Sequence, residues 1–92
     1  MTSLPLTFVI IVNWNGREVT LDCLDSFRKV SYSPLKIVVV DNGSTDGSVQ
    51  AIRAQYPDVI VLEMHTNLLF AGGTNAGIRY GLEHGGALFV VL

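Results

Sequence analysis

Short runs of apolar residues alternate with polar segments along the chain. The runs are nearly continuous and rich in β-branched side chains, and they cover residues 8–12, 37–40, 59–62 and 87–92. Continuous runs of this length are typical of strands buried on both faces, as in a parallel sheet covered by helices. The pattern therefore predicts interior strands at these places.

Between the runs, apolar residues recur with helical spacing. The helices predicted in this way cover residues 17–29, 47–55 and 74–84. In the second, Val49, Ile52 and Tyr56 form one apolar stripe. In the third, Ile78 and Leu82 lie four residues apart, as side chains on one face of a helix do.

The resulting element order is β-α-β-α-β-α-β. Strands that alternate with helices over short connections form a parallel sheet with right-handed crossovers. We therefore expect an α/β fold, a Rossmann-like and mostly parallel sheet with helices on both faces.

Polar residues collect in three loops that follow predicted strands. Rich in Asn, Asp, Ser, Thr and Gly, these loops cover residues 13–16, 41–47 and 65–75. Ligands of open parallel sheets bind outside the carboxyl ends of the strands. The distribution therefore predicts a ligand site at that edge.

Asp41 comes directly after a buried strand, so its carboxylate is expected at the mouth of that strand. It can accept hydrogen bonds from a base N–H or from ribose hydroxyls, whereas in a purely structural interpretation Asp41 and Ser44 cap a turn or the next helix. Asp46 precedes Gly47 and the second helix, and this position favours an N-cap over a ligand contact.

The loop after the first strand reads Asn13-Trp14-Asn15-Gly16. Trp14 is expected either to stack on a base or to pack against the first helix. Asn13 and Asn15 are expected either to contact a ligand or to satisfy the backbone of a tight turn.

A glycine-rich segment, residues 70–77, is expected to lead into the third helix. Backbone N–H groups at a helix N-terminus suit a phosphate, and Gly72 and Gly73 would permit close approach of a ligand or simply a tight turn. The segment matches neither the G-x-x-x-x-G-K-[ST] nor the G-x-G-x-x-G phosphate motif.

Composition excludes several classes of protein. The chain has 92 residues, 49% hydrophobic and 15% charged, which supports one domain and excludes disorder. Its six basic residues are scattered, so nucleic acid is not an expected partner. No apolar window reaches about 18 residues, the length at which a transmembrane helix becomes plausible.

Cys23 is the single cysteine, which excludes an intramolecular disulfide and a cysteine metal cluster and fits a reducing, cytoplasmic setting. His65 and His84 have no acid or second histidine at metal-ligand spacing, so neither is expected to be a ligand or a base.

The alternative functions for these loops are an NAD(P) oxidoreductase, a methyltransferase of the usual α/β type and a nucleotide-binding module without catalysis. An NAD(P) oxidoreductase would need glycines in the first strand–helix turn, where this chain has Trp14. A nucleotide-binding module without catalysis stays open.

The three loops taken together, in order, are far more specific than any one of them. The segments that carry the signal are Asn13-Trp14-Asn15-Gly16, the run from Asp41 to Ser48, Asn67 with Phe70-Ala71-Gly72-Gly73, and Asn75-Ala76-Gly77. Together they resemble the N-terminal part of family 2 glycosyltransferases of the GT-A fold, most closely the rhamnosyltransferase-type branch. The resemblance covers residues 6–92. It departs at Leu69, where relatives often have Gly.

This resemblance implies transfer of a sugar from a nucleotide-diphosphate sugar donor to a hydroxyl of a glycan or lipid-linked acceptor, as in polysaccharide or cell-envelope glycan synthesis. It implies that the position of Asp41 contacts the base, that residues 12–15 lie beside base and ribose, and that residues 72–75 border the donor. The implied substrate-binding residues are Val12, Asn13, Trp14, Asn15, Asp41, Asn42, Ser44, Gly72, Gly73 and Asn75.

In such enzymes the strand that matches residues 87–92 leads into a D-x-D motif, which holds Mg²⁺ or Mn²⁺ on the diphosphate, and the general base follows later. The resemblance therefore implies that residues 1–92 are the donor-binding N-terminal portion of a single domain, inactive alone. It also implies a cytoplasmic location, with the inner face of the membrane for the complete protein as the alternative.

Overall fold

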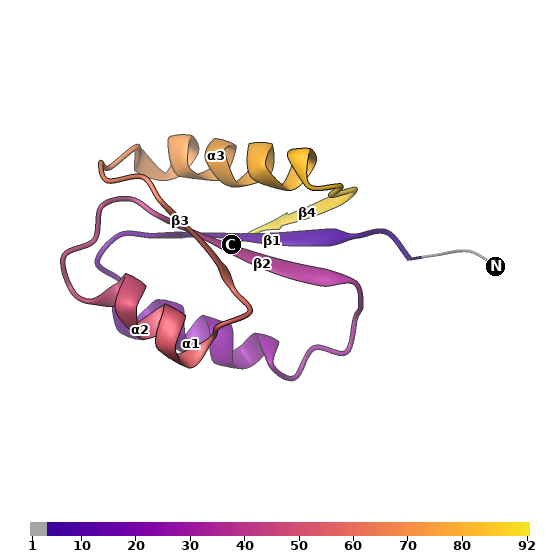
Figure 1. Cartoon of the computed structure of the whole chain (residues 1–92), viewed down its shortest axis with the longest axis horizontal. Coiled ribbons are helices and arrows are strands. Elements are labelled where there is room, and N and C mark those ends of the chain that lie inside the picture. The colour runs from indigo at the N-terminus through magenta and orange to yellow at the C-terminus, as the bar shows by residue number, and fades with distance from the viewer. Residues whose placement is uncertain (1–3) are drawn as a thin grey trace.

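The computed structural model describes residues 4–92 and confirms the predicted alternation of strands and helices (Figure 1). The elements are β1 (Thr7–Asn13), α1 (Arg17–Phe27), β2 (Leu35–Asp41), α2 (Ser48–Gln55), β3 (Ile60–Glu63), α3 (Leu69–Glu83) and β4 (Leu88–Val91). The boundaries of the strands differ from the predicted ones by one or two residues, and α1 ends two residues earlier than predicted.

All strands are parallel, in the order β3-β2-β1-β4. The register pairs Asn13 with Asp41 and Asp41 with Glu63, so β1, β2 and β3 end at one common edge. In the part of the chain that the structure describes, β3 and β4 form the two edges of the sheet, so the expectation of an interior strand is wrong for β3. That β4 is an interior strand of a larger domain stays a prediction. Leu88 and Val90 of β4 are about half exposed.

Helices cover both faces of the sheet, with α3 on one face and α1 and α2 on the other (Figure 1). Side chains alternate along a strand, so Phe8 and Ile10 pack beneath α3, whereas Val9 and Ile11 pack beneath α1 and α2. All four are at least 95% buried. No helix among residues 4–92 is both long and apolar enough to cross a bilayer.

Helix α3 begins at Leu69, five residues before the predicted start, so Gly72 and Gly73 lie inside the helix and the expectation of a glycine-rich loop is wrong. Glycine weakens a helix in isolation, but here packing on the sheet outweighs propensity. Its buried face consists of Gly73, Gly77 and Gly81.

These glycines bring the backbone of α3 close to the strands. A Cβ atom at Gly77 would lie 2.5 Å from Cγ2 of Ile10, and one at Gly81 would lie 2.5 Å from Cε1 of Phe89. The inward stripe predicted from Ile78 and Leu82 is therefore wrong for Leu82, which is 62% exposed.

Candidate functional site

Asn13 and Asp41, the last residues of the two central strands, form the buried floor of the carboxyl edge. Their exposed fractions are 1% and 3%. The Asn13 Nδ2 group donates to Oδ1 of Asp41 at 2.8 Å and to Oγ of Ser44 at 3.1 Å. The backbone N–H of Ser44 donates to Oδ2 of Asp41 at 2.9 Å, and the Thr20 hydroxyl donates to Oδ1 of Asn13 at 2.7 Å. Every polar atom of the Asn13 side chain is thus engaged.

The turn-forming interpretation of Asp41 and Ser44 is therefore confirmed, since each carboxylate oxygen of Asp41 already accepts one hydrogen bond from the protein. A carboxylate oxygen has two lone pairs, so Asp41 retains capacity for further donors. Its contact with a ligand stays a prediction.

Two further hydrogen bonds join the loop after β1 to the loop after β2. The Asn15 backbone N–H donates to Oγ of Ser44 at 2.8 Å, and the Thr45 N–H donates to Oδ1 of Asn15 at 2.7 Å. Asn15 has a φ of 49°, a left-handed conformation that asparagine tolerates better than most residues. The turn-satisfying interpretation of Asn15 is thereby confirmed.

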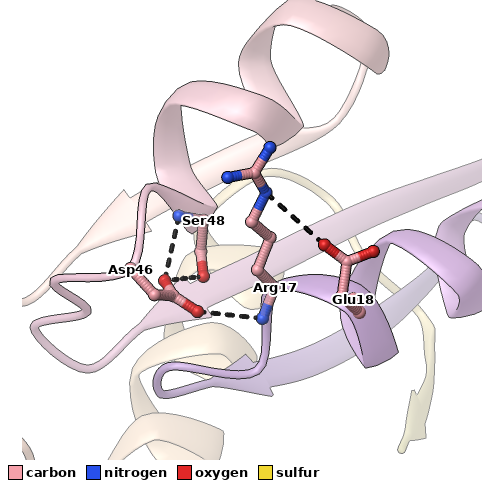
Figure 2. Close-up of polar contacts among 4 residues, drawn as sticks. All are labelled: Arg17, Glu18, Asp46 and Ser48. Carbon is pink, nitrogen blue, oxygen red and sulfur yellow. Dashed lines mark hydrogen bonds and ion pairs between the residues drawn. The ribbon is translucent and has the colours of Figure 1, made fainter.

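Asp46 connects the starts of α1 and α2 (Figure 2). Oδ2 accepts the backbone N–H of Arg17 at 3.1 Å, and Oδ1 accepts the backbone N–H of Ser48 at 3.0 Å. The Ser48 hydroxyl donates to the same Oδ1 atom. Gly47, with a φ of 80°, occupies the N-cap position of α2, so the expectation of Asp46 as the N-cap is wrong by one residue, although Asp46 accepts the first N–H of the helix.

These contacts favour the ionised form of Asp46. The Ser48 hydroxyl contributes most, and the N–H groups of Arg17 and Ser48 add to it, so the pKa of the Asp46 carboxyl lies below its ordinary value. The bond to Arg17 was missed by sequence reasoning because its partner is 29 residues away. The Arg17 guanidinium pairs with Glu18 at 3.8 Å, an exposed contact of small energetic weight.

Asn42 links the carboxyl edge to the start of α3. It is 1% exposed, and its Nδ2 group donates to the carbonyl oxygen of Leu69 at 3.0 Å. A Cβ atom at Gly73 would lie 3.2 Å from Nδ2 of Asn42 and 3.0 Å from Cγ1 of Val12. Val12, Asn42 and Gly73 are therefore brought together, and their contact with a ligand stays a prediction. The Asn42 Oδ1 atom is buried and has no partner among residues 4–92.

Leu69, where the resemblance departs, has a backbone conformation that favours glycine. Its φ is 62°, in the left-handed region, and its side chain is 71% exposed. The Asn67 Oδ1 atom accepts the Leu69 N–H at 2.8 Å.

The remaining predicted site residues lie at the margin. Trp14 is 57% exposed, so it is not the anchor against α1 that one interpretation predicted. In the first turn of α3, a Cβ atom at Gly72 would lie 2.8 Å from Cβ of Leu68. Asn75 is exposed on α3.

Beside the joined loops, an open groove of about 680 Å³ runs along α2 and is lined by Arg17, Ser44, Thr45 and Gln50, among others. Asp41 does not line it. Residues 4–92 contain no group of three or more His, Cys, Asp or Glu side chains placed to hold a metal ion. The resemblance implies a divalent metal held by an acidic motif outside these residues.

The model of the family described as "Glycosyl transferase family 2" matches residues 8–83. An uncharacterized glycosyltransferase of Rickettsia bellii is 31% identical over 84 residues, which cover 90% of this chain and 12% of that protein. One of Nostoc sp. is 35% identical over 72 residues, 75% of this chain and 22% of that protein.

Among solved structures, the chain is similar to the mannosyltransferase PcManGT from Pyrobaculum calidifontis, in complex with GDP-Man and Mn²⁺. The two chains superpose with a TM-score of 0.75 and are 29% identical, and the match covers 86% of this chain and 25% of PcManGT. The chain thus spans a quarter or less of the length of each of these three proteins. Since the family model matches most of the chain, on a fold shared with a solved member of the GT-A class, the chain belongs to glycosyltransferase family 2.

Proposed function

We propose that this chain binds the nucleotide diphosphate of a sugar donor at the carboxyl edge of its sheet, and that the whole protein transfers the sugar to an acceptor hydroxyl. The observation that carries the proposal is the position of Asp41, whose carboxylate lies at the edge where β1 and β2 end in register. Family membership supports the class of reaction.

In this proposal Asp41 accepts an N–H of the base with its remaining lone pairs. Asn13 and Ser44 hold the carboxylate in one orientation through their bonds at 2.8 and 2.9 Å. Trp14, with more than half of its surface exposed, supplies a flat face on which a base or ribose packs.

The first turn of α3 is proposed to face the diphosphate. The first four N–H groups of a helix lack intrahelical partners, and that of Leu69 is already bonded to Asn67. Phe70 and Ala71 therefore supply the donors in this proposal, while Gly72 and Gly73 contribute by lacking side chains. Asn75 is proposed to border the same site one turn later.

The finer assignments are also proposals. Residues 1–92 are proposed to be the donor-binding portion of a single catalytic domain, and Mg²⁺ or Mn²⁺ to be held by an acidic motif outside residues 4–92. The donor is proposed to carry a hexose or a deoxyhexose such as rhamnose, and the acceptor to be a glycan or lipid-linked glycan of the cell envelope. The PcManGT structure, in complex with GDP-Man and Mn²⁺, supports the nucleotide-sugar donor and the divalent metal.

Calorimetric titration with UDP, GDP and dTDP, each with Mn²⁺, tests the proposal. Asp41→Ala is expected to weaken the tightest of these by about tenfold or more, as loss of a hydrogen bond to a charged group predicts. Asp58→Ala is the matched control, because Asp58 is an exposed carboxylate in the turn before β3, at the opposite edge. Equal affinity of the wild type and Asp41→Ala would refute the assignment of Asp41.

A further inference from the structure

The single carboxylate of Asp46 meets the first residue of two helices. Its Oδ2 atom lies 3.1 Å from the N atom of Arg17, which begins α1, and its Oδ1 atom lies 3.0 Å from the N atom of Ser48, which begins α2 (Figure 2). The two helices lie side by side on one face of the sheet and share one apolar core. Asp46 is thus a bridge between their N-termini.

Only an ionised carboxylate suits both contacts. The first N–H groups of a helix have no intrahelical partner, and a negative charge is favourable near a helix N-terminus. A carboxylate offers two acceptor oxygens and no donor, whereas an amide of the same shape offers one acceptor and one N–H₂ group. An amide at this position caps one helix and turns a donor towards the other.

The bridge lies next to the loops that carry the proposed donor contacts. Arg17 comes two residues after Asn15, and Asp46 comes two residues after Ser44. Asn15 and Ser44 are themselves bonded at 2.8 Å, so the contact between Arg17 and Asp46 continues the same seam between the two loops. The seam ends at Asp41 and Asn13, through their bonds to Ser44.

We propose that Asp46 is a positioning residue, which by bridging the starts of α1 and α2 fixes Trp14 and Asn15 relative to Asp41 and Ser44. This inference rests on the proposed function, because it concerns the geometry of the donor site. Asp46 itself contacts no donor in this account. A donor that touches both loops requires their spacing to be set before it binds, since ordering them on binding would lower affinity.

Asp46→Asn and Asp46→Ala separate bridging from simple capping. A residue that only accepts the Ser48 N–H predicts wild-type behaviour for Asp46→Asn, because the asparagine side-chain oxygen can accept the same N–H. A bridging residue predicts that both variants bind the tightest of UDP, GDP and dTDP, with Mn²⁺, about tenfold more weakly, because small displacements of positioned groups lower affinity and rate. Asp22→Asn, which removes one exposed charge from α1, is the matched control and retains wild-type affinity.

Arg17→Pro cuts the bridge from the other side. Proline is favoured at the first position of a helix, where its missing N–H breaks no intrahelical bond, so α1 is retained. It removes the donor to Asp46 and is expected to weaken nucleotide affinity as Asp46→Asn does. Arg17→Ala keeps the N–H, loses only the guanidinium, and is expected to bind as the wild type does.

Hydrogen exchange at the amides of Arg17 and Ser48 completes the test. Faster exchange at both amides in Asp46→Asn, together with weaker nucleotide binding, supports the inference. Wild-type affinity in Asp46→Asn and Arg17→Pro would overturn it while the proposed function stands. Absence of nucleotide binding by the wild-type protein would instead overturn the proposed function. The positioning role would fall with it, even if hydrogen exchange at Arg17 and Ser48 shows that the bridge of Asp46 is formed.

Discussion

Helix α3 packs on its face of the sheet through glycines, whereas α1 and α2 pack on the other face through larger side chains such as Leu24 and Ile52. On the α3 side, the helix backbone contacts side chains of β1 directly, so a residue larger than glycine has almost no room there. On the other side, the loops that begin the helices are joined by hydrogen bonds through Ser44 and Asp46. Close packing thus positions α3 on one side of the proposed site, and hydrogen bonds position the loops before α1 and α2 on the other.

The largest effect is expected on the α3 face. Gly77→Ala places a Cβ atom 2.5 Å from Cγ2 of Ile10, so strand and helix must separate. We expect a loss of about 2–3 kcal/mol in the free energy of unfolding, typical of overpacking. Denaturant titration measures it, with exposed Arg79→Ala on the same helix as control. A loss no larger than that of the control would mean that glycine is not required there.

A smaller effect is expected on the other face, where Thr20→Val removes the hydroxyl that donates to Asn13 Oδ1 at 2.7 Å. The buried amide oxygen would lose its partner, at a cost of about 1–2 kcal/mol. Thr20→Ser keeps the hydroxyl and is expected to recover most of that stability. If the serine and valine variants unfold at the same denaturant concentration, packing of the methyl group rather than the hydrogen bond matters at this position.

Leu69→Gly is expected to stabilise the protein. A left-handed φ costs a residue with a side chain about 1–2 kcal/mol, and the greater freedom of glycine in the unfolded chain offsets part of the gain, leaving a net increase of about 0.5–1 kcal/mol. Leu68→Gly is the matched control because Leu68 has a φ of −85° and gains nothing from glycine. Equal destabilisation by both substitutions would argue against strain at Leu69.

The smallest expected effect is the pH dependence of the bridge. The pKa of Asp46 is lower in the folded than in the unfolded state, so ionised Asp46 contributes stability above its ordinary value of 3.8, and this contribution is lost as the pH falls through the folded pKa. The difference in thermal midpoint between the wild type and Asp46→Asn should shrink between pH 5 and pH 2. The difference in thermal midpoint between the wild type and Ile52→Val serves as the reference, because neither side chain titrates. A difference between the wild type and Asp46→Asn that grows on acidification would contradict the bridge.

The sequence predicts what depends on local pattern. Continuous apolar runs predict the strands, and the carboxyl-edge rule brings Asn13 and Asp41 to the same edge, where they are bonded. The start of α3 was not predictable in this way, because Gly72 and Gly73 lower helix propensity and only contact with the sheet explains them. The bond from Arg17 to Asp46 likewise depends on which loops the fold places together.

The position of the donor site is tested most directly by mapping nucleotide binding onto the backbone. Amide chemical shifts of the protein are followed while the tightest of UDP, GDP and dTDP is titrated in. For a donor site at the carboxyl edge, the shifts are expected to concentrate at residues 12–15, 41–44 and 70–75 and to leave the turns before β2, β3 and β4 unchanged. Shifts confined to those turns, or to the groove along α2, would contradict a donor site at the carboxyl edge.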